Sequence, residues 1–563
     1  MAKIHLRVFT VGEICEVPIE TLIALFTIKF CDSMVRVVLV RDAKIVGENS
    51  FGADISAYQY EIVECSELSD ISKSCHLPNF EENDRNCIAG LCATLRQIIK
   101  NTLSSNPEHP CKDLLGFKES CLLACSEVSV WTKFCEIDIV CMLRNVMGGQ
   151  DDILPIALAR FESHMSQPVR LHNVYKYTMS KKFSNSPVVQ DRSVVPEHTY
   201  AEGLTLSLAD IIIFVCIHIF FNFVEKKQIC AVAPLTVKWY ENMMTKDHVI
   251  RCLDVLYIEN LKKSYVIVNY VLPTIEMQSL YKSDFKRSKP RNRIFTKQDD
   301  VDNSLEKIRS SKLNIHLDKS VSLEDNLDWS NIPRDATPEG GDLPNTRLQR
   351  KFQQLESLCK PILKLAKDGD VIVDFCSGGG HLGILLAYLL PKCNIVLLEN
   401  KAKSIEKARV RVERLSLKNV IFYQSNLDYF KGRFDIGTSL HACGVATDLV
   451  LQQCIKNNAA FVCCPCCYGS IQDCDLITYP RSQAFRDILD KKSYFVLGHA
   501  ADQTHDAENI KTKQGYECMS MIDSDRRLQA EECGYQVYLD KLKPESCSPK
   551  NDLLVGWPKT RTL

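Results

Sequence analysis

Residues 368–390 read DGDVIVDFCSGGGHLGILLAYLL and predict how the surrounding chain folds. The β-branched run at 371–373 indicates a buried strand, and the apolar run after His381 indicates a helix. A strand, a glycine-rich turn and a helix in this order hold nucleotide-like ligands at the carboxyl end of an open parallel sheet. Glycine lets a backbone approach its ligand and lets a helix pack closely on a strand. The glycines that we expect to do so are Gly378, Gly379, Gly380 and Gly383.

Polar side chains close this strand and the two strands predicted after it. Asp374 ends the first strand, Glu399 ends CNIVLLE and Asn426 ends VIFYQSN. Glu399 follows Gly378 by 21 residues, a spacing at which an acid accepts hydrogen bonds from ribose hydroxyls. We therefore predict that Asp374 meets the amino end of the ligand, Glu399 its ribose and Asn426 its adenine edge. A P-loop is excluded because no lysine follows the glycines.

Helices and strands continue to alternate from Thr346 to the end of the sequence. They predict an α/β fold with a Rossmann-like sheet over 346–563, closed by a hairpin of GYQVYLDKL and NDLLVGWP. The stretch DFCSGGGHLG, with the acid and the amide after the next two strands, resembles the first three motifs of class I methyltransferases. The resemblance implies S-adenosylmethionine as the cofactor of these residues. The sequence departs from the family pattern at Cys376, where a glycine is usual.

A histidine follows the fourth predicted strand, FDIGTSL, in the motif HACGVATD. In class I methyltransferases the residues after this strand face the transferred methyl group, so the resemblance gives His441 the place of a catalytic base or substrate ligand. A neutral imidazole can remove a proton from a hydroxyl or ring nitrogen at physiological pH. The alternative is that His441 only hydrogen-bonds to the turn.

Four cysteines follow the fifth predicted strand in AAFVCCPCCYG. The CxxC spacing occurs twice, from Cys463 to Cys466 and from Cys464 to Cys467. No second CxxC or histidine pair lies nearby, so we expect packing or substrate positioning and no metal site. Pyrimidine C5-methyltransferases use cysteines at such places, which leaves covalent attack by Cys443 with Cys464 or Cys466 as a minority alternative. HACGVATD and CCPCCYG are similar to motifs of the tRNA 2′-O-methyltransferases that modify the acceptor stem.

The amino-terminal half resembles glutathione S-transferases. Residues 1–110 look like a degenerate thioredoxin-like domain, with Pro78 at the position of the cis-proline. Residues 111–280 are mainly helical by their apolar spacing and resemble the helical domain of these transferases. The resemblance rests on PLTVKWYENMM and on GLTLSLADIIIFV, in which Ser207 and Asp210 form a helix capping box.

Glutathione binding is not expected of this half. A helix is predicted from Cys87 onward. At its start these transferases place a serine that binds the γ-glutamyl group, whereas this sequence has Asn86 and Cys87. We therefore expect a docking module, for a protein partner or for self-association. The apolar stretch 211–224 is shorter than the ~20 residues that a bilayer requires, so no membrane is expected as a partner.

The segment 281–345 has few apolar residues and is interpreted as a linker. Its basic run KRSKPRNR, at 286–293, is a candidate contact for RNA phosphates, although such runs are more often solvated. Lys plus Arg (69) balances Asp plus Glu (70), so any nucleic acid must meet a local patch. The 27 cysteines lie within apolar runs and indicate reduced thiols in a cytoplasmic protein. Arg526, in the last predicted crossover helix, faces either substrate or solvent, and solvent is the expected side.

The sequence therefore predicts an S-adenosylmethionine-dependent methyltransferase that acts on RNA and carries a transferase-like docking half. As a whole it resembles a family of animal proteins that join these two halves. Two alternatives stay open: a glutathione-binding or glutathione-transferase protein, and a non-catalytic scaffold, each with a relic methyltransferase domain.

Overall fold

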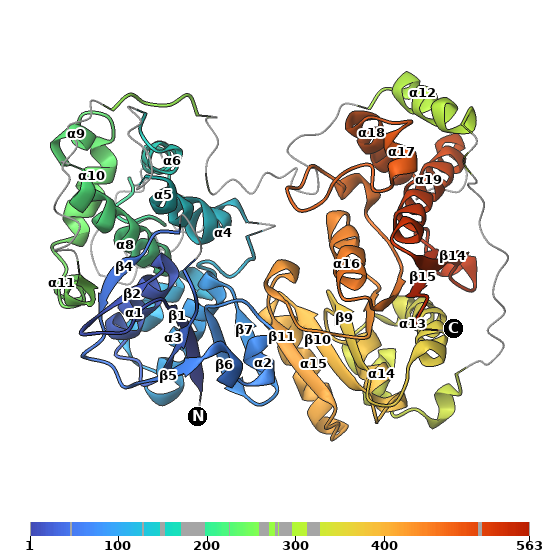
Figure 1. The fold of residues 1–563 in the computed structure, drawn as a ribbon, viewed down its shortest axis with the longest axis horizontal. Helices are drawn as coiled ribbons and strands as arrows, with labels where there is room; N and C mark the ends of the chain where they lie inside the picture. Colours follow the sequence, from blue (N-terminus) through green and yellow to red (C-terminus); the bar gives the residue numbers. More distant parts are fainter. Residues whose placement is uncertain are drawn as a thin grey trace, which may run out of the picture. The chain divides into compact units, whose positions relative to one another are not determined.

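The computed structural model divides into two compact units, Met1–Asp284 and Phe285–Leu563 (Figure 1). Each unit has an apolar core of its own. The structure describes residues 2–44, 48–126, 129–146, 153–169, 197–224, 226–257, 270–275, 280, 296–311, 313, 327–504 and 509–561.

The first unit begins with a mixed sheet of strand order β7-β6-β1-β3-β5. Strands β1 and β3 are parallel, β6 is antiparallel to β1, and β7 is antiparallel to β6. This βαβ unit is followed by an antiparallel pair of strands and a helix. The elements are β1 Lys3–Val8, β2 Ile14–Val17, α1 Ile19–Phe30, β3 Arg36–Arg41, β4 Phe51–Asp54, β5 Tyr60–Glu64, α2 Asp70–Lys73, β6 Asn79–Asn83, β7 Asn86–Ala89 and α3 Leu91–Ser105. Strands β2 and β4 form a second sheet with β8 Leu256–Tyr257.

Two expectations about this sheet have different outcomes. The peptide bond before Pro78 is cis, as predicted. The helix predicted from Cys87 is wrong over its first residues, because Cys87 pairs with β6 and α3 begins only at Leu91. Gly90, with φ of 106°, separates the strand from the helix. A short apolar run beside a glycine fits either element, and pairing with β6 decides for the strand.

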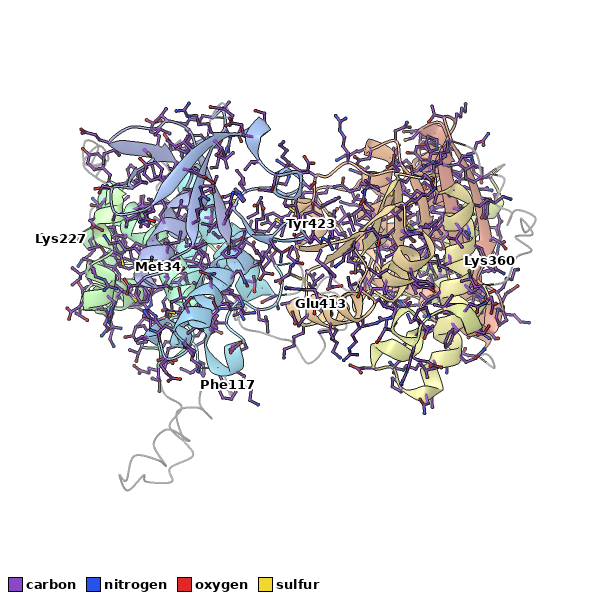
Figure 2. All side chains as sticks on the ribbon, turned by 90° about the horizontal axis from the view of Figure 1, so that it is seen from below. Met34, Phe117, Lys227, Lys360, Glu413 and Tyr423 are labelled. Atoms are coloured by element: carbon purple, nitrogen blue, oxygen red, sulfur yellow. The ribbon has the colours of Figure 1, made fainter. Side chains whose placement is uncertain are left out.

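Helices make up the rest of the first unit. They are α4 Val130–Lys133, a π-helical stretch Phe134–Asp138, α5 Ile139–Val146, α6 Ile156–Met165, α8 Leu208–Phe223, α9 Lys226–Cys230, α10 Pro234–Met243 and α11 Asp247–Ile250. The predicted capping box is confirmed, since the backbone N–H of Ser207 donates to Asp210 Oδ2 at 2.9 Å. Helix α8 is buried along most of its length in the core. Met34, which is labelled in Figure 2, lies between α1 and β3 and is exposed. No helix among the described residues is long and apolar enough to cross a membrane.

The second unit contains the predicted Rossmann-like sheet, with strand order β14-β15-β13-β12-β9-β10-β11. Strands β9 to β13 are parallel, and β15 lies antiparallel between β13 and β14. The elements are α13 Asn345–Leu365, β9 Val371–Phe375, α14 His381–Leu389, β10 Asn394–Glu399, α15 Ala402–Arg414, β11 Val420–Gln424, β12 Ile436–Ser439, α16 Val445–Lys456, β13 Ala460–Cys463, α17 Gln483–Arg486, α18 Lys491–Ala501, α19 Ile510–Glu532, β14 Tyr535–Lys541 and β15 Asp552–Pro558. Strand β10 pairs with one edge of β9 and β12 pairs with the other, so the strand order reverses at β9. Ligands bind at the carboxyl ends of strands around such a switch point.

Part of the segment interpreted as a linker is folded onto the second unit. Helix α12, Gln298–Arg309, buries Val301, Leu305 and Ile308 in one apolar cluster with residues of α18 and α19. Their three- and four-residue spacing forms an apolar stripe on an otherwise charged helix. Three short 3-10 turns follow, at Trp329–Asn331, Arg334–Ala336 and Pro338–Gly341. The basic run 286–293 lies outside the described residues.

Arg526 does not face solvent, which corrects the sequence-based expectation. Its side chain is 1% exposed and donates from Nε and Nη2 to the buried carboxylate of Asp448, at 2.9 Å each. Nη1 donates to Asp523, also at 2.9 Å. Helix α19 packs on α18 and on the closing hairpin, so the face that carries Arg526 is covered. A buried guanidinium requires such acidic partners, and one of them, Asp448, comes from HACGVATD.

Candidate active site

Asp374 closes the central strand β9 and supports the glycine turn. It is 2% exposed, and its Oδ2 accepts a hydrogen bond from the backbone N–H of Gly383 at 2.9 Å. Burial raises the pKa of Asp374 to about 7, and the nearby ammonium of Lys351 acts in the opposite direction. A cationic group placed beside this carboxyl would favour its ionised form. The site thus suits a ligand with a protonated amino end.

Glu399 holds the same turn from the neighbouring strand β10. Its Oε2 accepts from the backbone N–H of Gly378 at 2.9 Å, and its Oε1 accepts from that of Lys401 at 3.0 Å. Each carboxylate oxygen can accept a second hydrogen bond, so Glu399 keeps acceptor capacity for ligand hydroxyls. Asn426 lies two residues after the end of β11, the next strand of the sheet, and is largely buried. The three predicted side chains therefore lie at one edge of the sheet.

The glycines of the turn have two different environments. A Cβ added to Gly378 or Gly379 would meet nothing within 4 Å, whereas a Cβ on Gly383 would lie 2.1 Å from Leu397 Cδ2 in β10. Gly380, with φ of +73°, is also close to Leu397. Gly383 and Gly380 thus allow α14 to pack on the sheet, and Gly378 and Gly379 leave the outer face of the turn open.

Two serine hydroxyls bear on whether a polar ligand fits beside that open face. The hydroxyls of Ser377, in the turn, and Ser425, after β11, are buried without a hydrogen-bond partner in the structure. A buried polar group normally has a partner, which a ligand can supply. Cys376 has φ of 55°, a conformation that costs most non-glycine residues about 1–2 kcal/mol, and this explains why glycine is usual here. The residues present fit S-adenosylmethionine.

Arg411, which the sequence did not single out, fixes the other side of the turn. It is 3% exposed and donates to three backbone carbonyl oxygens. Nη1 reaches Gly379 O at 3.1 Å, Nε reaches Asp335 O at 2.9 Å and Nη2 reaches Thr337 O at 3.0 Å. Helix α15 thereby ties the glycine turn to the 3-10 turns that precede α13. An amphipathic helix contains several such arginines, and nothing in the pattern distinguishes this one.

His441 lies in the loop after β12, at the same edge of the sheet, and contacts a lysine. Its Nε2 is 3.0 Å from Nζ of Lys351 on α13, and it accepts a hydrogen bond from that ammonium. The surrounding protein desolvates the imidazolium and Lys351 repels it, so the pKa of His441 falls to about 4 although the side chain is solvent-accessible. The histidine is therefore neutral at physiological pH, as a base must be. Lys351 also interacts with Asp374, and the sequence reasoning missed it.

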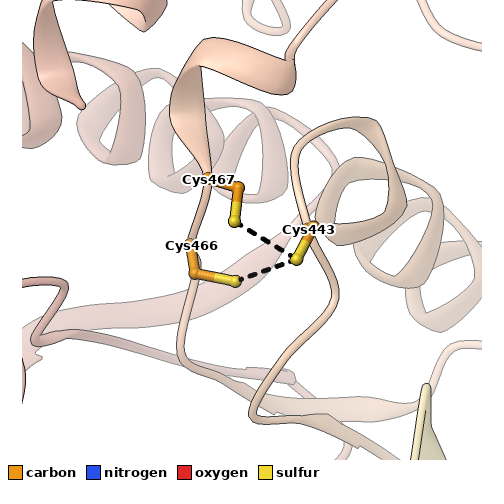
Figure 3. A group of neighbouring side chains, drawn as sticks. All are labelled: Cys443, Cys466 and Cys467. Carbon is orange, nitrogen blue, oxygen red and sulfur yellow. Dashed lines mark hydrogen bonds between the residues drawn. The ribbon is translucent and has the colours of Figure 1, made fainter. Parts of the chain in front are cut away.

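Three cysteines converge beside His441, from the loops after β12 and β13 (Figure 3). The Sγ atom of Cys443 is 3.6 Å from that of Cys466 and 3.3 Å from that of Cys467. Hydrogen bonds from the other two thiols lower the pKa of Cys443. Cys464 lies apart from this group, buried with its Sγ 3.5 Å from Lys550 O, and burial raises its pKa. Of the two pairs in the covalent alternative, only Cys443 and Cys466 are therefore in contact.

A family model and a solved structure match part of the chain. A family model described as a methyltransferase domain matches residues 350–474, a range that includes Asp374, Glu399, Asn426, His441 and the cysteine cluster. Among solved structures, an rRNA methylase from Streptococcus thermophilus matches at 9% identity with a TM-score of 0.23, over 36% of this chain and 96% of that chain.

Curated relatives match nearly the whole chain. The human glutathione S-transferase C-terminal domain-containing protein is 33% identical over 97% of this chain and 96% of its own length. The Drosophila melanogaster homologue is 43% identical, over 96% of this chain and 95% of its own length. With such identity along both units, the chain belongs to the family of glutathione S-transferase C-terminal domain-containing proteins.

Proposed function

We propose that the methyltransferase domain of the second unit binds S-adenosylmethionine and transfers its methyl group. The observation that carries the proposal is the glycine turn held between Asp374 and Glu399 at the switch point of the sheet, with its face at Gly378 and Gly379 open. Asp374 would hold the amino group of the cofactor, Glu399 its ribose and Asn426 its adenine. The cofactor supplies an electrophilic methyl group. This chain supplies the neutral His441, which would accept the proton of the methyl acceptor.

We also propose RNA as the methyl acceptor and the first unit as a docking module. The similarity of HACGVATD and CCPCCYG to tRNA 2′-O-methyltransferases supports the RNA acceptor. A ribose hydroxyl needs a base, and His441 is held unprotonated by Lys351 and by desolvation. Helix α3 begins after Gly90, which has no side-chain hydroxyl to bind a γ-glutamyl group, and this supports docking over conjugation.

Calorimetry with S-adenosylhomocysteine tests the cofactor site. We expect the full-length protein to bind it, and Glu399→Gln to weaken binding by roughly 10- to 150-fold, because hydrogen bonds to a charged group contribute about 1.5–3 kcal/mol. Glu413→Gln, on the exposed face of α15, is the matched control and should bind like the wild type. Absence of binding by the wild-type protein would refute the proposed function.

Transfer of a tritiated methyl group tests the acceptor. Incubation of the protein and labelled S-adenosylmethionine with fractionated cell extract should label the RNA fraction, and ribonuclease should remove the label. The Asp374→Ala variant lacks the carboxylate that supports the glycine turn, so it should transfer no labelled methyl group to any fraction. Label that resists ribonuclease and follows protein would contradict RNA as the acceptor while leaving the cofactor site intact.

A further inference from the structure

We propose that Cys443, Cys466 and Cys467 form a Zn²⁺ site with three protein ligands and one exchangeable position. Their three Sγ atoms lie within 4.8 Å of one another. In a tetrahedral site with Zn–S bonds of about 2.3 Å, neighbouring sulfurs are about 3.8 Å apart. The distances from Cys443, 3.6 and 3.3 Å, need to open by only a few tenths of an ångström. The sequence-based expectation of no metal site considered only pairs within CCPCC.

Backbone contacts hold the two loops together without help from a metal. Strands β12 and β13 are neighbouring parallel strands, so the loops that follow them leave the sheet side by side. Cys443 and Cys466 form an isolated β-bridge, and the N–H of Gly444 donates to Cys466 O at 3.0 Å. A Cβ on Gly444 would lie 2.6 Å from the backbone of Ser470, so the loops can approach this closely only with glycine there. The ligands are therefore preorganised.

Cys467 supplies a separate sign of function at this place. Its φ of 52° and ψ of 51° lie in the left-handed region, which a cysteine rarely adopts. Such conformations cluster at functional sites, where the surrounding structure imposes them. Here the conformation accompanies a side chain whose thiol contacts Cys443 (Figure 3).

The chemistry of the cluster selects a soft divalent cation. The three ligand atoms are sulfurs, two of them half-buried, and thiolates favour Zn²⁺ over Mg²⁺ or Ca²⁺. Three thiolates around Zn²⁺ leave one net negative charge. The ammonium groups of Lys401, near Cys443, and Lys550, near Cys466 and Cys467, would offset that charge.

Two neighbouring groups of the kind that binds zinc, His441 and Asp502, are engaged in other contacts. His441 Nε2 accepts from Lys351, so the neutral imidazole carries its proton on Nδ1 and neither ring nitrogen offers a lone pair to a metal. Asp502 accepts from the N–H of Gly469 at 2.9 Å and pairs with Lys550 at 3.3 Å. The fourth position is therefore left to water or to another exchangeable ligand, as in zinc sites with three protein ligands. This inference does not depend on methyl transfer. It does exclude covalent attack by Cys443, since the metal would occupy its thiolate.

Metal content and Co²⁺ spectra of the full-length protein test the proposal. Protein purified with Zn²⁺ under reducing conditions and then dialysed should retain about one Zn²⁺ per chain, a stoichiometry that follows from one three-cysteine site. Cys443→Ser and Cys467→Ser should each lose this equivalent. Cys474→Ser, a half-buried cysteine outside the cluster, should keep it and controls for the other thiols. His441→Ala should also keep it, because the histidine is not a ligand.

Titration of the metal-free protein with Co²⁺ covers the case in which a variant folds poorly. The wild type and Cys474→Ser should show intense thiolate-to-cobalt absorption, and Cys443→Ser should lose it while its far-ultraviolet circular dichroism matches the control. Wild-type protein without retained metal and without cobalt–thiolate absorption would overturn the proposal. Equal metal content in Cys443→Ser and Cys474→Ser would overturn it too, and loss of zinc in His441→Ala would overturn the exchangeable fourth position.

Discussion

Replacement of Asp448 by Ala should lower the free energy of unfolding of the second unit by about 3–5 kcal/mol, the cost of breaking a buried ion pair from one side. Asp448 is fully buried and accepts two hydrogen bonds from Arg526 and one from Tyr479 Oη at 2.8 Å. Without it, the Arg526 guanidinium keeps its ion pair with Asp523, and no other acidic partner is seen within the described part of the chain. Burial alone would raise the pKa of Asp448, but Arg526, Arg481 and Tyr479 together offset burial and the pKa is lowered.

Urea unfolding of the full-length protein, followed by a probe in the second unit, measures this loss. Asp473→Ala is the control, because Asp473 pairs with Lys491 at 2.7 Å on the surface and such pairs contribute at most about 1 kcal/mol. Because the folded-state pKa of Asp448 is depressed, its contribution is complete above the unfolded pKa of about 3.9 and is lost only as pH falls through the lower folded value. A loss for Asp448→Ala no larger than for the control would contradict the prediction.

Replacement of His441 by Ala should slow methyl transfer by about 10²- to 10⁴-fold, the usual contribution of a general base. The reason is the position of His441 after β12 and its neutral state beside Lys351. Calorimetry with S-adenosylhomocysteine should show unchanged cofactor binding, because Asp374 and Glu399 hold the glycine turn without the histidine. Unchanged turnover would remove His441 from the mechanism.

The dependence of the rate on pH gives the same base an independent signature. Its pKa of about 4 means that the base is unprotonated throughout the neutral range, so the rate should fall only as pH drops toward 4. Lys351→Met removes the repelling ammonium, which should raise the pKa of His441 and shift this fall to higher pH. An acidic limb that is the same in wild type and Lys351→Met would argue against their coupling.

The glycine turn and its acids were predictable because they depend on local pattern and on a property of every parallel sheet. A β-branched strand followed by glycines and an apolar helix predicts β9, the turn and α14. The carboxyl ends of parallel strands share one edge, so Glu399 had to lie near Gly378 once β9 and β10 were adjacent. The capping box of α8 is local in the same way.

Contacts between distant segments were decided only by the tertiary structure. Lys351 and His441 are 90 residues apart, Asp448 and Arg526 are 78 apart, and Cys443 and Cys466 are 23 apart. The short-range periodicity of a sequence reports which face of an element is apolar, but it does not report which elements pack together. Packing therefore buries Arg526, which composition suggested was solvated. It also turns a CxxC string that looked incomplete into a cluster, because the third thiol comes from the neighbouring loop.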